Sequence, residues 1–139
     1  MNDLEISAWD GAGYRPVVDY ASWRVAFLNS DPAYLPENID FAQYHRDTDE
    51  VFVLISGACT LILFGADEQA LGEPRAVCLQ HGRMYNVKKG VWHTHALAPD
   101  TKVLIVENRD TTNGNSPVLP LDAPMRRALV RACDQAGNV

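Results

Sequence analysis

The chain has 139 residues, of which 47% are hydrophobic and 22% charged, and its formal net charge is -6. These values are typical of one globular domain with a sizeable core, and they exclude a disordered chain. The acidic balance provides no basic surface for nucleic acid or an anionic membrane. No apolar run approaches the roughly 20 residues that a transmembrane helix needs.

The cysteines Cys59, Cys78 and Cys133 are odd in number, widely spaced and outside any C-x-x-C pair. This pattern indicates reduced, packed thiols and argues against a disulfide framework or a zinc site. The first five residues lack the positive and apolar regions of a secretory signal. We therefore expect a cytoplasmic protein.

The first third of the chain predicts strands interrupted by a proline-containing loop. Residues 14–29 are dense in β-forming side chains and predict one or two strands. Two prolines between residues 32 and 38 predict a loop or a single helical turn. Residues 39–45 alternate with a period of two, which places Gln43 and His45 on the same face of a strand.

The rest of the chain continues in short β segments and ends in a helix. The predicted strands cover residues 50–55, 59–64, 75–79, 84–87, 91–97 and 102–108. Residues 110–120 are rich in Thr, Asn, Ser and Pro and predict a loop. Asp122 is a suitable cap for a helix over about residues 122–133, with Pro124 near its start. Many strands at hairpin spacing predict an all-β, closed or sandwiched antiparallel fold in one domain, residues 1–139.

Two stretches carry histidine, glutamate and glycine at defined spacings. In the first, four residues separate His45 from Glu50, and six separate Glu50 from Gly57. In the second, Gly82 is followed by Gly90 and then by His93 after two further residues. The two stretches resemble the paired motifs of the cupin superfamily. The resemblance covers about residues 38–108 and implies a double-stranded β-helix, which is a jelly-roll barrel.

The chain departs from the cupin motifs at several positions. Gln43 stands where the first motif has its first histidine, Lys88 replaces a proline, and Leu97 replaces an asparagine. An additional histidine, His95, follows two residues after His93. These departures bear on metal binding more than on the fold. The strands before the motifs and the helix after them are candidates for an interface, and we expect a homodimer.

Alternation along the strands of such a barrel would bring His45, Glu50, His93 and His95 into one pocket. Two histidines and a carboxylate suit iron(II), and manganese, nickel or zinc also fit such a site. We therefore expect His45, Glu50 and His93 to bind a divalent metal, with His95 either as a fourth ligand or as a group that binds substrate. The alternative is a metal-free cupin in which the same groups hydrogen-bond one another and a ligand.

Further residues are expected around the pocket. The expected substrate-pocket residues are Gln43, Phe52, Tyr85 and Glu107. Glu107 is either the end of a row of core side chains or an acid at the pocket mouth. Trp92 points away from the pocket and is expected to pack. Val51, Val53 and Ile55 also point away, and their apolar character predicts that the outer face of their strand is covered.

A second, narrower resemblance concerns the reaction. Residues 85–87, 91–93 and 105–109 are similar to segments of the ureidoglycolate lyase branch of the cupins, which cleaves ureidoglycolate to glyoxylate and urea. Three functions follow as hypotheses. The first is a metal-dependent oxygenase, isomerase or lyase acting on a small polar organic substrate in the barrel. The second is a metal-free enzyme of the ureidoglycolate lyase type, for which the resemblance implies His93 or His95 as the catalytic group that transfers a proton. The third is a non-catalytic module that binds or senses a small ligand.

Overall fold

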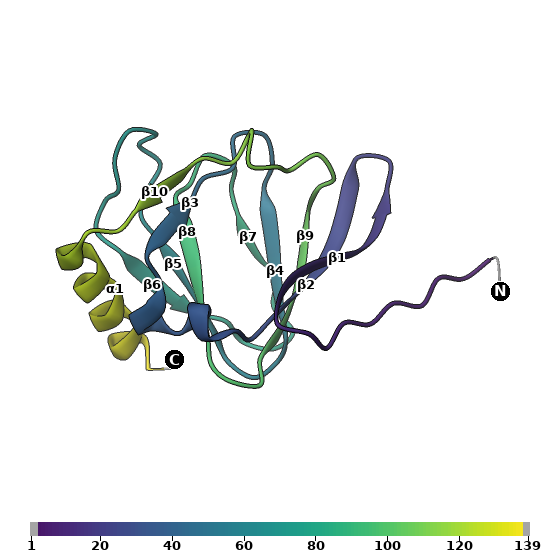
Figure 1. The fold of residues 1–139 in the computed structure, drawn as a ribbon, viewed down its shortest axis with the longest axis horizontal. Helices are drawn as coiled ribbons and strands as arrows, with labels where there is room; N and C mark the ends of the chain where they lie inside the picture. The colour runs from purple at the N-terminus through teal and green to yellow at the C-terminus, as the bar shows by residue number, and fades with distance from the viewer. Residues whose placement is uncertain (1–2, 138–139) are drawn as a thin grey trace.

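The computed structural model describes residues 3–137, which form two antiparallel sheets facing each other (Figure 1). The first sheet has the order β1 (Gly13–Tyr20), β2 (Trp23–Asn29), β9 (Lys102–Asn108), β4 (Glu50–Ser56) and β7 (Tyr85–Val87). The second has the order β10 (Val118–Pro120), β3 (Phe41–Gln43), β8 (His93–Leu97), β5 (Cys59–Leu63) and β6 (Arg75–Cys78). Two short 3-10 turns, Pro32–Tyr34 and Pro36–Asn38, join β2 to β3. This two-sheet jelly roll confirms the predicted all-β fold class.

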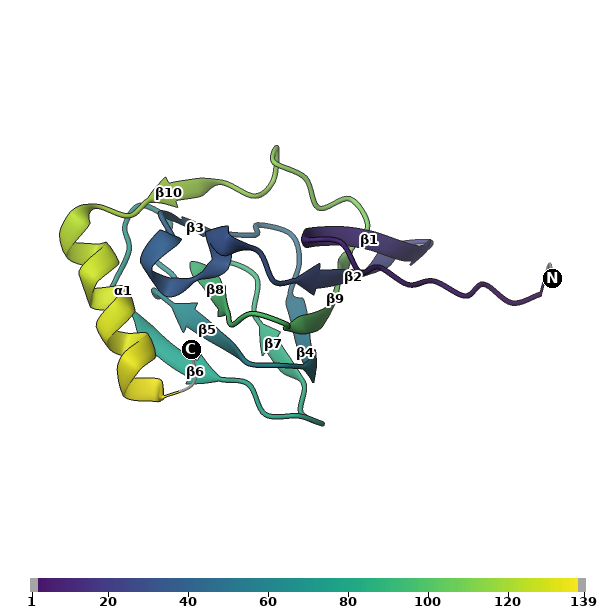
Figure 2. The same cartoon turned by 60° about the horizontal axis from the view of Figure 1, so that its bottom comes forward.

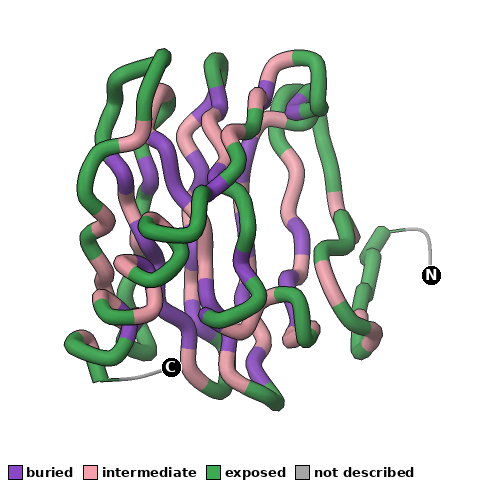
Figure 3. The backbone as a smooth tube through the Cα atoms, turned by 60° about the vertical axis from the view of Figure 1, so that its left-hand side comes forward, coloured by how far each residue is buried: buried purple, intermediate pink, exposed green. Residues whose placement is uncertain are grey.

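The inner faces of the two sheets enclose the main core, because alternate residues of each strand point between them. Along β9, for example, Val103, Ile105 and Glu107 are buried while their neighbours are half-buried. The core side chains come from both sheets: Ala26, Leu28, Phe52, Leu54, Cys59, Leu61, Leu79, Val87, Leu97, Val103 and Ile105. Figure 3 shows this distribution, with buried stretches along the strands and exposed ones in the loops.

The outer faces of the two sheets differ. The helix α1 (Ala123–Ala136) packs on the outer face of the second sheet, beside β6 (Figure 2). The outer face of β4 is only partly covered, since Val51 and Val53 are half-buried and Ile55 is 46% exposed. The expectation that apolar side chains there imply a full cover is therefore wrong.

A second hydrophobic cluster lies between the second sheet and α1. Its buried residues are Ile39, Ala42, Ile62, Phe64, Trp92, Ala96, Leu121, Leu129, and Cys133. The helix contributes Leu129 and Cys133, which are four residues apart and so share one face. As expected from the sequence, Asp122 caps the helix, its carboxylate accepting from the backbone N–H of Met125 at 2.9 Å. The helix ends at Gly137, whose φ is 83°.

The tight turn after β4 shows why a glycine ends the first motif. Gly57 has a φ of +84°, a conformation that side chains with a Cβ rarely adopt. A Cβ at this position would collide with the side chain of Thr101 and lie 2.6 Å from its Cα. The hydroxyl of Thr101 also accepts from the N–H of Ala58 at 3.0 Å. The glycine therefore allows the β4–β5 turn to pack directly on the β8–β9 turn.

Four elements differ clearly from the sequence prediction. β3 covers only Phe41–Gln43 of the predicted residues 39–45, so His45 lies after the strand and not on it. β10 lies in the segment that predicts a loop, because a three-residue edge strand ending in proline leaves little pattern. β8 begins at His93, two residues later than expected, and α1 continues three residues beyond 133. Within residues 3–137, no helical segment combines the length and the apolar character that a membrane crossing requires.

Candidate metal centre

Three side chains from distant parts of the chain meet at one end of the barrel. His45 lies just after β3, Glu50 is the first residue of β4, and His93 is the first residue of β8. Each offers a ligand atom, and these atoms lie within 4.8 Å of one another. All three residues are buried. The site is therefore built from both sheets, with Glu50 from the first and His93 from the second.

Loops on two sides hold the backbone around His45. The N–H groups of Tyr44 and Arg46 donate to carbonyl groups in residues 109–117, at 3.0 and 3.1 Å. We call these residues, which connect β9 to β10, the strap. The carbonyl of His45 accepts from the N–H of Gly90 at 2.8 Å. These contacts fix the position of His45, although its segment is not part of a regular strand.

Hydrogen bonds at Nδ1 determine the tautomers of the two histidines. His93 Nδ1 lies 2.9 Å from the carbonyl oxygen of Val91, which only accepts, so Nδ1 carries the hydrogen. His45 Nδ1 lies 2.6 Å from Ser116 Oγ, and that hydroxyl donates to Oδ1 of Asn115 at 3.2 Å. The serine oxygen therefore accepts from His45 Nδ1. In the neutral form, both rings then present a bare Nε2.

Both Nε2 atoms face the same carboxylate oxygen. Oε1 of Glu50 lies 2.9 Å from His93 Nε2 and 3.3 Å from His45 Nε2. Three acceptor atoms at one point repel one another unless a proton or a metal cation lies between them. Burial alone would raise the pKa of Glu50, but its close contacts with His45 and His93 and the charge of His93 hold that pKa well below its usual value. This donor set fits a divalent cation.

Beside the three residues lies a cavity of about 400 Å³. His95 and Gln43 both line it, as the sequence predicts, and Gln43 pairs directly with His93 across β3 and β8. His95 is not within ligand distance of the other three groups and instead packs edge-on against Tyr34, with 5.0 Å between the ring centroids. Burial lowers the pKa of His95 to about 4, so its ring is neutral near neutral pH. Its role as a fourth ligand is therefore not supported.

Two expected pocket residues lie elsewhere. Phe52 is fully buried and packs against the histidines of the site. Its ring centroid lies 6.2 Å from that of His93 and 6.0 Å from that of His95. Tyr85 lines a separate groove between β5 and β7, and its hydroxyl accepts from the N–H of Gln80 at 3.0 Å. Its predicted place in the pocket is wrong because β7 is the edge strand on the far side of β4 from β9.

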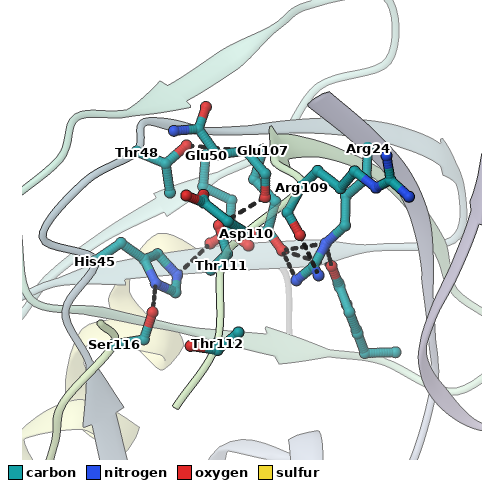
Figure 4. Close-up of polar contacts among 12 residues, drawn as sticks. Arg24, His45, Thr48, Glu50, Glu107, Arg109, Asp110, Thr111, Thr112 and Ser116 are labelled. Atoms are coloured by element: carbon teal, nitrogen blue, oxygen red, sulfur yellow. Dashed lines mark hydrogen bonds and ion pairs between the residues drawn. The ribbon is translucent and has the colours of Figure 1, made fainter. Parts of the chain in front are cut away.

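Glu107 is part of the pocket wall and lies beside Glu50 (Figure 4). Val51 pairs with Val106 across β4 and β9, so the next residues on each strand, Glu50 and Glu107, are opposite one another. Burial and the nearby charge of Glu50 raise the pKa of Glu107. Glu107 both ends the buried row of Val103 and Ile105 and lines the cavity, so the structure combines features of the two interpretations left open by the sequence, a core residue and an acid of the pocket.

Glu107 also has two polar partners on neighbouring strands. Its Oε1 accepts from the hydroxyl of Tyr14 at 2.5 Å and from Nη2 of Arg24 at 2.7 Å. Its Oε2 is buried without a hydrogen-bond donor. Arg24 and Glu107 are direct neighbours in the register of β2 and β9. No local pattern in the sequence marks Tyr14, Arg24 or Ser116 as site residues, because their partners are more than 70 residues away in the chain.

The similarity of this chain to known proteins lies in its structure. No protein-family model matches the chain, and no curated protein matches its sequence. In structure, it is similar to a cupin-2 domain protein of Shewanella frigidimarina, with 25% identity and a TM-score of 0.51 over 73% of this chain and 85% of that one. The chain therefore has the cupin fold, which confirms the resemblance seen in the motifs.

Two further solved structures share the fold. A dTDP-sugar isomerase of Desulfovibrio desulfuricans is 19% identical, with a TM-score of 0.54 over 82% of this chain and 85% of that one. A hydroquinone 1,2-dioxygenase of Sphingomonas, with 4-hydroxybenzoate bound, is 14% identical, with a TM-score of 0.55 over 73% and 70%. These likenesses show the fold and leave the reaction to be inferred from the site.

Proposed function

We propose that this protein is a divalent-metal-dependent enzyme that acts on a small polar organic substrate inside the barrel. His45, Glu50 and His93 would bind the metal, in the two-histidine, one-carboxylate arrangement that suits iron(II) and also accepts manganese, nickel or zinc. The main observation in favour of this proposal is that the Nε2 atoms of His45 and His93 and a carboxylate oxygen of Glu50 converge at one buried point. Nε2 of His45 has no hydrogen-bond partner there, which a bound cation would provide.

A divalent cation at this point would supply Lewis-acid polarisation of a substrate oxygen or, in the case of iron, reaction with oxygen. The protein's own groups would orient the substrate. The cavity of about 400 Å³ has the size of a small-molecule site. His95 is neutral, and its buried Nδ1 has no partner, so a ligand can hydrogen-bond to it. Gln43, at the end of β3, is a further polar group in the wall.

Metal analysis tests the proposal directly. Protein purified without chelator is expected to contain close to one Fe, Mn, Ni or Zn per chain, and chelated protein is expected to recover one Mn²⁺ per chain on titration. Elemental analysis and calorimetry measure the two quantities. Substoichiometric metal that does not change in the His45→Ala variant would rule out the site.

One observation favours a metal-free alternative of the ureidoglycolate lyase type. The 2.9 Å separation of His93 Nε2 and Glu50 Oε1 is also that of a hydrogen-bonded imidazolium and carboxylate. Such a pair could transfer a proton to or from a bound substrate. Release of glyoxylate from ureidoglycolate, undiminished by excess chelator, would support this alternative. Activity that is lost with chelator and restored by Mn²⁺ would refute it.

Ser116 is predicted to position His45 for metal binding. Ser116→Ala removes the acceptor that holds the hydrogen on Nδ1, so His45 can adopt the other tautomer or rotate. We expect the Mn²⁺ affinity to fall by about 10–100-fold, the usual effect of losing a partner of a ligand histidine. Calorimetric titration measures the change, and Ser116→Thr is expected to restore most of the affinity.

Ser22→Ala is the matched control, because Ser22 is exposed in the β1–β2 turn and does not line the cavity. Circular dichroism checks that each variant is folded. An affinity for Mn²⁺ that is equal in Ser116→Ala and Ser22→Ala would show that the serine does not position His45.

A further inference from the structure

The cavity beside the candidate metal centre is lined by more acidic than basic side chains. Among the described residues that line it, Arg24 is the only lysine or arginine, whereas Asp40, Glu50 and Glu107 supply carboxyl groups. A carboxylate or phosphate ligand is normally bound by a free arginine or lysine. The selectivity of the cavity for charge therefore depends on whether Arg24 is free.

The guanidinium of Arg24 is already engaged by the protein. Its Nη2 and Nε donate to Oε1 of Glu107 at 2.7 and 3.3 Å, and Nε also donates to the hydroxyl of Tyr14 at 3.0 Å. Its remaining nitrogen, Nη1, donates to the carbonyl of Arg109 at 3.3 Å. The side chains of Arg24 and Glu107 are 17% and 3% exposed, so little water competes with these contacts. Glu107 thus acts as an internal carboxylate in the place that an anionic ligand would take.

We propose that Glu107 determines the charge selectivity of the cavity. By occupying Arg24, it makes the part of the cavity beside Arg24 select an uncharged polar group over a carboxylate or phosphate. An anionic group at that place would meet the carboxyl group of Glu107 without finding a free cationic side chain. A neutral ligand can instead use uncharged groups, including the hydroxyls of Thr111 and Thr112 on the strap. This inference rests on the proposed function in one respect, that a small molecule binds in this cavity.

The substitution Glu107→Gln isolates the charge from the geometry. A glutamine Oε1 still accepts from Tyr14 and Arg24, and its amide nitrogen takes the place of the buried Oε2. The variant is therefore expected to fold, while the positive charge of Arg24 is no longer neutralised. The double variant Arg24→Gln, Glu107→Gln removes the freed cation as well.

The test uses benzamide and benzoate, two planar molecules of nearly equal shape that differ in charge. Binding of each is measured by NMR titration of chelated and of Mn²⁺-loaded protein, and the ratio of the two dissociation constants is the readout. In Glu107→Gln, we expect the ratio to shift toward benzoate by about tenfold, because the negative charge of Glu107 no longer repels the benzoate carboxylate. In the double variant, we expect the ratio to return to the wild-type value.

Glu68→Gln is the control, because Glu68 is also paired with an arginine, Arg46, but lies exposed outside the cavity. It is expected to leave the ratio unchanged. An unchanged ratio in Glu107→Gln, no measurable binding of benzoate by that variant, or a gain that persists in the double variant would each overturn the inference. A shifted ratio in a protein that binds no Mn²⁺ would refute the proposed metal dependence and leave the inference standing.

Discussion

Replacing Glu50 with glutamine is expected to abolish stoichiometric binding of a divalent cation. The carboxylate oxygen Oε1 faces the Nε2 atoms of both His45 and His93. A glutamine amide has no charge, and its NH₂ group can donate to one of these nitrogen atoms and so occupy a ligand position. We expect the Mn²⁺ affinity to fall by more than about 100-fold, beyond the effect of losing an outer partner.

Calorimetric titration and elemental analysis after desalting measure this loss. Glu68→Gln makes the same chemical change at an exposed ion pair and is expected to bind Mn²⁺ like the wild type. Circular dichroism is expected to be unchanged in both variants, because the amide introduced by Glu50→Gln would remain hydrogen-bonded to the histidines. Wild-type affinity in Glu50→Gln would mean that the carboxylate is not a ligand, and the proposed function would fail with it.

Replacing Trp92 with alanine is expected to have the largest effect on stability. Trp92 is 1% exposed, belongs to the cluster under α1, and packs on Tyr44 with 4.9 Å between ring centroids. Its Nε1 donates to the carbonyl of Asp67 at 2.8 Å, which ties the β5–β6 loop to the sheet. Truncation leaves a cavity and an unpaired carbonyl, so the free energy of unfolding should fall by about 3–5 kcal/mol.

The matched control is Trp23→Ala, since Trp23 is 41% exposed on β2. Its loss should cost less than about 1 kcal/mol. Chemical denaturation followed by circular dichroism measures both values without relying on tryptophan fluorescence. Equal effects of the two substitutions would show that Trp92 is not a core residue.

The spacing of the motif residues was sufficient to predict that His45, Glu50 and His93 converge, because this spacing indicates where each strand begins and where the turns lie. Glu50 and His93 each begin a strand, and Gly57 ends one at a turn that tolerates no Cβ. Alternation also predicted correctly that Trp92 would point away from His93 into a packed layer. These inferences needed only local order along the chain.

What could not be predicted depends on which strands become neighbours. The contact of Arg24 with Glu107 arises from the pairing of β2 with β9, and no local pattern specifies that pairing. Ser116 lies in a stretch whose composition predicts only a loop, although its hydroxyl contacts His45. The position of Tyr85 outside the pocket could not be predicted for the same reason, since no local pattern shows that its strand is an edge strand of the first sheet. The partly covered outer face of β4 could not be predicted either, because it depends on which of the two sheets α1 packs against.

The division of the site between the two sheets has a thermodynamic consequence. Glu50 extends from the first sheet and His93 from the second, so these two halves of the site separate when the sheets come apart. Whatever is held jointly by the two residues is bound by the native state and not by the denatured chain, and its binding free energy adds to the resistance to denaturation. Affinity and conformational stability are therefore coupled properties of this protein, and selection on one changes the other.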